Sequence, residues 1–191
     1  MKKLLLIMLT VLCLGLTGCL APTQTMLTTT YSFDRDTAEK QMRPGNNTIK
    51  GSALLRQRGG GIVTCAGGQV ALYPYSRYAQ ERMQVLYLDE NGGNNPFVLT
   101  NPMMGKYSQV SFMRGISTPA EDDYIELRRE TQCNAQGFFS FSNLADGDYY
   151  IVTVIEWVAP NANQAPQGGY IMKKVHVEGG ETKEVVINGQ P

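Results

Sequence analysis

Cysteine is the residue type whose placement in this chain implies the most chemistry. Cys13 and Cys19 lie in or just after an N-terminal apolar run, whereas Cys65 and Cys133 lie in the remainder of the chain. A thiol can be acylated, can pair into a disulfide or can bind zinc. Zinc is disfavoured, because Cys65, Cys133 and the single His176 are fewer than the four ligands that a structural zinc site uses. We therefore expect no metal and no cofactor.

The N-terminal segment has the pattern of a secretory signal. A pair of lysines precedes the apolar run Leu4–Leu14, which is shorter than the about 20 residues that span a membrane. The segment ends in Leu16-Thr17-Gly18-Cys19, which resembles the lipobox of bacterial lipoproteins. The resemblance implies a signal peptide over residues 1–18 that is cleaved before Cys19, and acyl chains on Cys19. An ordinary secretory signal with an incidental cysteine is the alternative.

Lipid on Cys19 would hold the protein to a membrane. Each buried methylene contributes about 0.8 kcal/mol, and two or more acyl chains anchor a protein stably. Leu20 follows the cysteine, at the position where inner-membrane retention in enterobacterial lipoproteins usually shows Asp. The resemblance therefore implies a lipid anchor in the cell outer membrane, on a face that the sequence does not specify.

Cys65 and Cys133 are predicted to form a disulfide. A secretory signal places the chain in an oxidising compartment, and these two cysteines remain once Cys13 leaves with the signal and Cys19 is acylated. Closing such a long loop stabilises the fold by roughly 4 kcal/mol in the chain-entropy model. Two buried free thiols are the alternative.

The sequence contains few residues that could form a catalytic set. The adjacent carboxylates of residues 121–123 could do acid–base chemistry, but such a run in a polar stretch is more typical of an exposed face. His176 lies in the alternating strand pattern Ile171–Val177, and no glycine-framed nucleophile accompanies it. We expect a protein that is not an enzyme; a hydrolase with an unrecognised site is the weakest alternative.

The elements that would position these residues begin with a tether. Residues 19–47 are rich in Thr, Gln and mixed charges, which predicts a lipidated N-terminus and flexible tether, with a short helix over Asp34–Met42 capped by Asp34 or Asp36. A flexible chain of about 28 residues spans about 30 Å. The turn cluster Pro44–Asn47 marks the start of a domain over residues 48–191.

Within this domain, short alternating runs separated by Gly- and Asn-rich turns predict strands, and one stretch has a helical period. Apolar residues recur every three or four positions near residues 75–88, where Ser76 can cap a helix that packs on the sheet. The strand candidates are Thr48–Arg56, Ile62–Cys65, Gln69–Tyr73, Phe97–Leu99, Val110–Met113, Tyr124–Arg128, Tyr170–Val177 and Glu181–Ile187.

The stretch Cys133–Trp157 predicts the central hairpin of the domain. Phe139 and Phe141 alternate onto one face of a strand, and Asp146-Gly147 is a strong turn signal. Tyr149–Val158 is apolar on both faces, which is typical of a covered central strand.

This stretch also carries a family resemblance. Gly137-x-Phe-x-Phe, followed by Asn143-Leu-x-x-Gly147-x-Tyr149, resembles carboxypeptidase-regulatory-like domains, which are transthyretin-like sandwiches. Gly51 and Cys65-Ala-Gly resemble the first half of the same module. The resemblance implies a mainly all-β, Greek-key β-sandwich of about seven strands, with the helix near residues 75–88 and the segment 89–132 as insertions. Domains of this family accompany other activities and have no catalytic residues of their own.

Together these features predict a membrane-anchored, non-catalytic envelope lipoprotein that acts as a binding or scaffolding module or as a subunit of an envelope assembly. Its partners would be the membrane and another envelope protein or glycan. Nucleic acid is excluded, because 17 basic residues balance 17 acidic ones and lie scattered along the chain.

The alternative function is binding of a glycan or small molecule. Tyr73, Tyr75 and Tyr78 cluster in sequence, and the Asn-, Gln- and Gly-rich residues 160–169 could supply hydrogen bonds. An exposed row of these rings would favour sugar binding, whereas burial of all three would exclude it.

Overall fold

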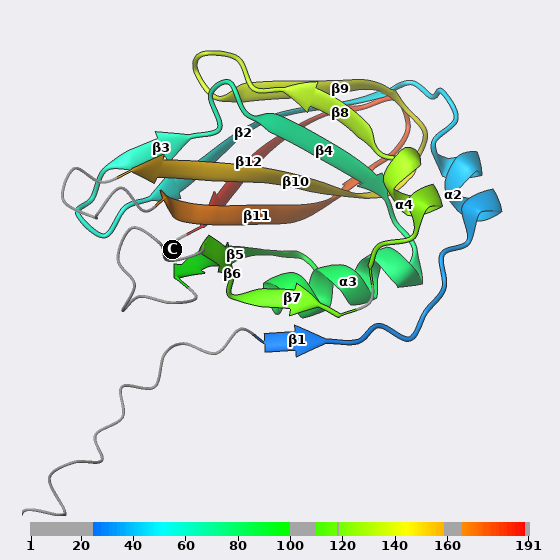
Figure 1. Ribbon diagram of the computed structural model, residues 1–191. Coiled ribbons are helices and arrows are strands. Elements are labelled where there is room, and N and C mark those ends of the chain that lie inside the picture. Colours follow the sequence, from blue (N-terminus) through cyan, green and yellow to red (C-terminus); the bar gives the residue numbers. More distant parts are fainter. Residues whose placement is uncertain (1–24, 100–109, 118, 159–165, 190–191) are drawn as a thin grey trace, which may run out of the picture.

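A computed structural model describes residues 25–99, 110–117, 119–158 and 166–189. Two packed β-sheets make up most of this part of the chain, and three short helices lie on its surface (Figure 1). The predicted mainly-β sandwich is therefore confirmed, with one helix more than the two expected. None of the helices in the described ranges is long and apolar enough to cross a membrane.

The larger sheet has six strands, and every neighbouring pair in it is antiparallel. The strand β10 lies near its middle and is buried on both faces, as its apolar pattern predicted. In spatial order the strands are β6 (Val110–Phe112), β5 (Gly92–Leu99), β11 (Pro166–Val177), β10 (Gly147–Val158), β4 (Gln69–Pro74) and β8 (Arg129–Gln132).

The second sheet is built around β2 (Asn47–Arg56). This strand runs parallel to β12 (Thr182–Gly189) and antiparallel to both β9 (Phe138–Leu144) and β3 (Ile62–Thr64). Alternate residues of β2 point into the core, where Ile49, Ala53 and Leu55 are buried. Their partners from the larger sheet include Val70, Leu72, Tyr149, Ile151, Ile155, Ile171, Val175 and Val177.

The predicted hairpin over Cys133–Trp157 is wrong in its pairing. Its two strands exist, but β9 pairs with β2 in the second sheet, whereas β10 pairs with β4 and β11 in the larger one. The turn at Asn143–Gly147 is therefore an arch that crosses between the sheets. An alternating apolar strand satisfies its hydrogen bonds with any edge of suitable register, so the local pattern could not select the partner.

The arch is held by a buried side chain from the start of β2. Asn47 donates to the Leu144 carbonyl at 3.1 Å and to Asp146 Oδ1 at 2.8 Å. Its own Oδ1 accepts from the backbone N–H groups of Gly180 and Glu181 at 2.8 and 2.9 Å. One amide thereby joins the arch to the turn between β11 and β12, which fixes the ends of both sheets.

The helix α3 (Arg77–Tyr87) confirms the predicted helical period. Ser76 is its N-cap, and its hydroxyl accepts from the Ala79 N–H at 3.0 Å. The helix lies along the outer face of the larger sheet, beside β7 (Arg114–Ile116) (Figure 1).

The helix α4 (Asp122–Glu126) replaces the strand predicted over Tyr124–Arg128. Asp122 and Asp123 lie in its first turn, where negative charge is favoured by the helix dipole. Arg35 pairs with Asp123 and with Glu126, which lie one turn apart on the same side of the helix. These interactions outweigh the weak alternation of apolar residues.

Residues 28–42, which were predicted to belong to a flexible tether, lie against the sandwich. Glu81 of α3 accepts hydrogen bonds from the backbone of Thr30 and Tyr31, and the Phe33 ring contacts Tyr78 and Tyr124. Upstream, β1 (Thr25–Leu27) pairs parallel with β7. The segment is held because its backbone N–H groups find carboxylate acceptors that the composition of the segment itself does not reveal.

The helix predicted within this segment is present as α2 (Arg35–Gln41). Asp34 is its N-cap, and its carboxylate accepts from both the N–H and the hydroxyl of Thr37. Its last residue, Gln41, donates to the Asp148 carbonyl. The helix is thereby fixed at the beginning of β10.

Candidate functional site

A second apolar cluster, separate from the core between the sheets, covers the outer face of the larger sheet. Strand register creates it, because Tyr73 of β4 lies opposite Tyr150 of β10, and Val152 lies opposite Met172 of β11. All four side chains lie in a cluster distinct from the inter-sheet core, together with residues of α3 and α4. The cluster is unusually aromatic, and its tyrosines are Tyr73, Tyr75, Tyr78, Tyr87, Tyr124, Tyr150 and Tyr170.

A cavity of about 300 Å³ opens within this cluster, bounded by both helices and by β6 and β7. Its described walls are mostly aromatic and aliphatic, and three polar side chains, Arg82, Asn95 and Arg114, also line it. A concave, mostly apolar site with a few convergent polar groups is the usual form of a small-ligand site. The aromatic residues that line it are Tyr73, Tyr87, Phe112, Tyr124 and Tyr170.

Four of the five aromatic rings that line the cavity form two packed pairs. Tyr73 stacks on Tyr124 with their centroids 4.7 Å apart and an angle of 17° between the planes. Phe112 and Tyr170 form a tilted pair with a centroid separation of 4.8 Å. Each ring is held by its pair partner, so the cavity presents fixed aromatic surfaces.

The hydroxyls of three tyrosines of the cavity, Tyr73, Tyr87 and Tyr124, are neutral over the physiological range. Burial raises the pKa of Tyr73, and burial also raises the pKa values of Tyr87 and Tyr124, because a phenolate loses its hydration there. These groups can therefore take part in hydrogen bonds as donors or acceptors, and they do not supply a base.

Two of the three polar side chains, Asn95 and Arg114, are fixed by backbone hydrogen bonds. Asn95 is 3% exposed, accepts from the Arg114 N–H at 2.9 Å and donates to the Arg114 carbonyl at 2.7 Å. The Arg114 guanidinium donates to the carbonyls of Leu86 and Asn94, and partial burial lowers its pKa without removing its charge at neutral pH. Arg82 lies over the rings of Tyr78 and Tyr124 at 5.4 and 6.0 Å.

The three tyrosines singled out from the sequence have different positions. Tyr73 is half-buried and lines the cavity, Tyr75 is half-buried beside Lys174, and Tyr78 is buried beneath α4. The three rings do not form an exposed row. Only Tyr78 is fully buried, so the condition that would exclude sugar binding, burial of all three rings, is not met. Of the loop predicted over residues 160–169, residues 160–165 lie outside the described residues. The prediction is wrong for residues 166–169, which belong to β11.

Sequence reasoning missed Phe112, Arg114, Tyr124 and Tyr170. Tyr170 and Met172 are two residues apart in β11 and therefore share a face of the strand. The sequence pattern predicted this strand, but it did not indicate which face of the sheet would carry the cavity. Phe112 and Tyr124 lie in predicted strands of the segment 89–132, and Arg114 follows the first of them, but the sequence did not indicate that these residues face one cavity.

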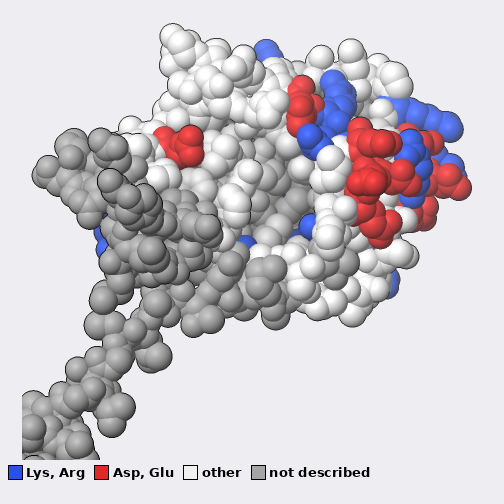
Figure 2. Space-filling model, in the orientation of Figure 1, with Lys and Arg blue, Asp and Glu red and all other residues white. Residues whose placement is uncertain are grey.

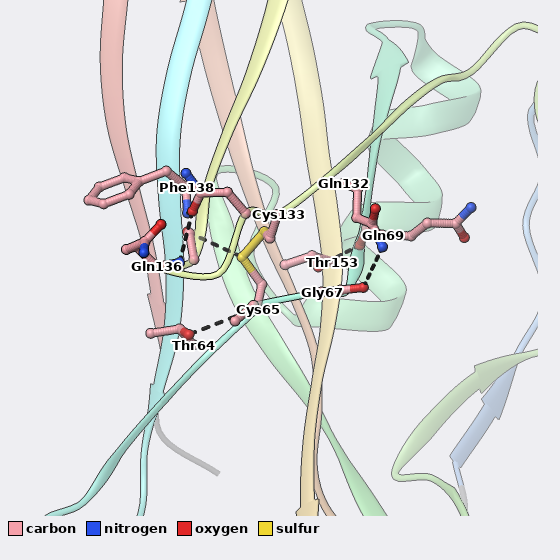
Figure 3. Close-up of a disulfide and its surroundings, with 12 residues drawn as sticks. Thr64, Cys65, Gly67, Gln69, Gln132, Cys133, Gln136, Phe138 and Thr153 are labelled. Carbon is pink, nitrogen blue, oxygen red and sulfur yellow. Dashed lines mark hydrogen bonds between the residues drawn. A yellow bond between two sulfur atoms is a disulfide. The ribbon is translucent and has the colours of Figure 1, made fainter.

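The predicted disulfide is present between Cys65 and Cys133, and both residues are buried in the core. It joins the segment after β3 to the end of β8 (Figure 3). Gln132 donates to the Gly67 carbonyl at 2.9 Å beside it, and the Cys133 N–H donates to the Gly68 carbonyl at 2.9 Å. The disulfide is therefore a structural link within a network of side-chain and backbone hydrogen bonds to the Gly67 and Gly68 carbonyls. Cys19 lies outside the described residues, and its acylation stays a prediction.

His176 and the acidic residues 121–123 lie apart from the cavity. His176 Nδ1 is 2.9 Å from Asp148 Oδ1, and this hydrogen bond raises the pKa of the imidazole. Glu121 accepts from the Phe33 N–H at 2.9 Å. Acidic and basic side chains interleave at the end of the molecule that carries α2 and α4 (Figure 2). These carboxylates hold α2 and the preceding segment.

Comparison with known proteins identifies the fold. No family model matches the sequence, and no curated protein matches it, so the resemblance to carboxypeptidase-regulatory-like domains stays a prediction. The chain is similar in structure to PA1324 of Pseudomonas aeruginosa, a proposed carbohydrate-binding protein, with a TM-score of 0.63 and 20% identity over 83% of this chain and 98% of that one. At this identity the likeness shows a shared fold.

A second structure, the SpaE basal pilin of Lactobacillus rhamnosus GG, is 13% identical over 74% of this chain and 46% of the pilin. Its TM-score of 0.27 is too low to support an argument.

Proposed function

We propose that this protein is a glycan-binding module that is anchored to the outer membrane by lipid on Cys19. The observation that carries the proposal is the cavity on the outer face of the larger sheet, where fixed aromatic rings surround a few polar donors. PA1324, whose fold this chain shares, has itself been proposed to bind carbohydrate, which points in the same direction.

The chemistry of the cavity suits a sugar ring. The C–H groups on one face of a pyranose are apolar and pack on aromatic rings, while its hydroxyls need hydrogen-bond partners at the rim. Tyr170 and Phe112 supply the first kind of surface. Neutral tyrosine hydroxyls and the donors of Arg82 and Arg114 supply the second.

The position of β1 would keep this cavity near the membrane. Five residues lie between Cys19 and Thr25. The six residue steps from Cys19 to Thr25 reach about 20 Å in an extended chain. Because β1 pairs with β7 and Gly115 of β7 lines the cavity, an anchor at Cys19 places the site close to the bilayer surface. This reach is shorter than the about 30 Å expected of a fully flexible tether of about 28 residues.

Binding can be measured with the Cys19→Ser protein, which keeps the whole chain and removes the acylated thiol. We expect envelope-derived oligosaccharides to bind in calorimetric or NMR titrations, and Tyr170→Ala to weaken the binding at least about tenfold, about 1.4 kcal/mol. Phe138→Ala is the matched control, because this ring is 56% exposed on the other sheet. Loss of binding in the control but not in Tyr170→Ala would place the site elsewhere.

The anchor is tested separately. Cells that express the wild-type chain should incorporate labelled palmitate into it and retain it in the outer-membrane fraction, whereas the Cys19→Ser variant should incorporate none and be released. Equal labelling of the two proteins would refute acylation at Cys19.

A further inference from the structure

The charge of the cavity is one-sided. Two guanidinium groups, Arg82 from α3 and Arg114 from β7, line it from different elements. Among the described residues that line it, none is Asp or Glu. A neutral ligand would not require two cations around an apolar site, whereas an anionic ligand would be stabilised by them.

Arg114 is held in place by neutral acceptors. Its Nε donates to the Leu86 carbonyl at 2.8 Å, Nη2 donates to the Asn94 carbonyl, and Nη1 lies 3.7 Å from the Met113 sulfur. These contacts orient the guanidinium and leave its positive charge without a carboxylate partner among the described residues. Partial burial strengthens the field of that charge relative to bulk water.

The nearby carboxylates are directed to other partners. Glu81 of α3 accepts from Thr30 and Tyr31, and Glu121 at the start of α4 accepts from Phe33. The carboxylates of Glu81 from α3 and Glu121 at the start of α4 therefore accept hydrogen bonds from the segment before α2. Arg82, from the same helix as Glu81, lies over the rings of Tyr78 and Tyr124 and lines the cavity.

From this arrangement we propose that the cavity selects acidic sugars, with the anionic group of the sugar ring, a carboxylate or a phosphate, facing Arg82 and Arg114. The inference rests on the proposed glycan-binding function and adds its ligand class. Both arginines act as specificity-determining residues, since they distinguish a charged ring from a neutral ring of the same shape.

The test compares ligands that share a sugar ring and differ in whether they carry an anionic group. Trigalacturonate and its methyl ester share every ring, as do glucuronate and its methyl ester, while glucose 6-phosphate is compared with glucose and with inorganic phosphate alone. With the purified full-length protein we expect an acid form to bind at least about tenfold more tightly than its neutral counterpart at low salt, since charge-assisted hydrogen bonds are the stronger ones. The preference for the acid form should be smaller in 0.5 M salt, because salt screens the attraction between the anion and the two arginines.

Three variants assign the preference to the cavity. Arg82→Gln should reduce the ratio of acid to neutral affinity several-fold while neutral binding persists, and Arg114→Lys should retain the ratio because it keeps the charge. Arg56→Gln, which removes an exposed cation on the other sheet, should leave the ratio unchanged. Thermal melting of each variant establishes that it is folded.

The outcomes separate the two proposals. Equal or tighter binding of the neutral forms would overturn the selectivity and leave glycan binding intact, whereas failure of every sugar to bind would overturn glycan binding itself. A preference confined to glucose 6-phosphate would identify phosphate as the anion. Inorganic phosphate binding as tightly as the sugar phosphate would contradict the inference, because the ring would then contribute nothing.

Discussion

Replacing Tyr150 by phenylalanine should stabilise this protein, which is the opposite of what removing a polar atom from a buried site usually does. Tyr149 and Tyr150 are adjacent on β10, both are 0% exposed, and their side chains lie on opposite faces of the sheet. The Tyr150 hydroxyl has no hydrogen-bond partner among the described residues. The Tyr149 hydroxyl lies 3.1 Å from the Gln41 carbonyl and 3.0 Å from the Ala145 carbonyl.

The magnitude follows from the cost of a buried, unpaired hydroxyl. Such a group destabilises the folded state by about 1–3 kcal/mol relative to its hydrated form in the unfolded chain. Phenylalanine keeps the ring and its contact with Tyr75, whose centroid is 6.0 Å away, so Tyr150→Phe should raise the free energy of unfolding by about 1 kcal/mol or more. Tyr149→Phe should lower it by about 1 kcal/mol, because a made hydrogen bond is lost.

Urea denaturation followed by circular dichroism measures both changes in the free energy of unfolding. The m-value should be the same for both variants and the wild type, because the surface exposed on unfolding is nearly unchanged. The two variants are matched controls for one another, since each removes one oxygen from a tyrosine of the same strand. A loss of stability in Tyr150→Phe equal to that in Tyr149→Phe would refute the reasoning and would mean that the Tyr150 hydroxyl is hydrogen-bonded in solution.

Three further predictions concern the disulfide, the histidine and a glycine. Replacing both Cys65 and Cys133 by alanine should lower the free energy of unfolding by about 4 kcal/mol in urea titrations, because the cross-link closes a sequence separation of 68 residues. Asp148 raises the pKa of His176, so the stability from this pair is fully present below about pH 6.5 and is lost as the pH rises through the folded pKa. The melting-temperature advantage of wild type over His176→Gln should therefore be largest near pH 5.5 and fade above neutrality. Gly51→Ala should destabilise the protein by about 1–3 kcal/mol in the same urea titrations, because an added Cβ would lie 2.5 Å from the buried ring that faces it.

Each of these has an outcome that would contradict it. Gly59→Ala is the control for Gly51→Ala, because no atom lies within 4 Å of a Cβ at that position, and equal effects of the two would argue against the packing explanation. An advantage of wild type over His176→Gln that grows with pH would have the wrong sign. A double-cysteine variant as stable as wild type would show that the link contributes nothing to the folded state.

The strands and helices were largely predictable because local periodicity and capping encode them. The helix α3 follows from apolar spacing and the Ser76 cap, and β10 follows from an apolar run with a turn signal at Asp146-Gly147. The disulfide followed from counting cysteines. Each inference uses information contained within a few residues of the chain or in its composition.

Three-dimensional pairing was not predictable in this way. Phe139 and Phe141 face the core from β9 whether that strand pairs with β10 or with β2, and the second alternative is the one observed. Asn47 selects it by joining the arch after β9 to the turn before β12, residues far apart in the chain. The helix α4 in place of a strand likewise depends on Arg35, about 90 residues away in sequence.

By itself, then, the sequence determined the N-terminal signal pattern, the kinds of element and the cysteine pair, because each is written in neighbouring residues or in simple counts. Tertiary structure alone decided the cavity. Tyr73, Tyr124, Tyr170, Phe112 and Arg114 come from β4, α4, β11, β6 and β7, and no short stretch contains more than two of them. They meet because strand register aligns the outward faces of the sheet and because two helices pack across that face.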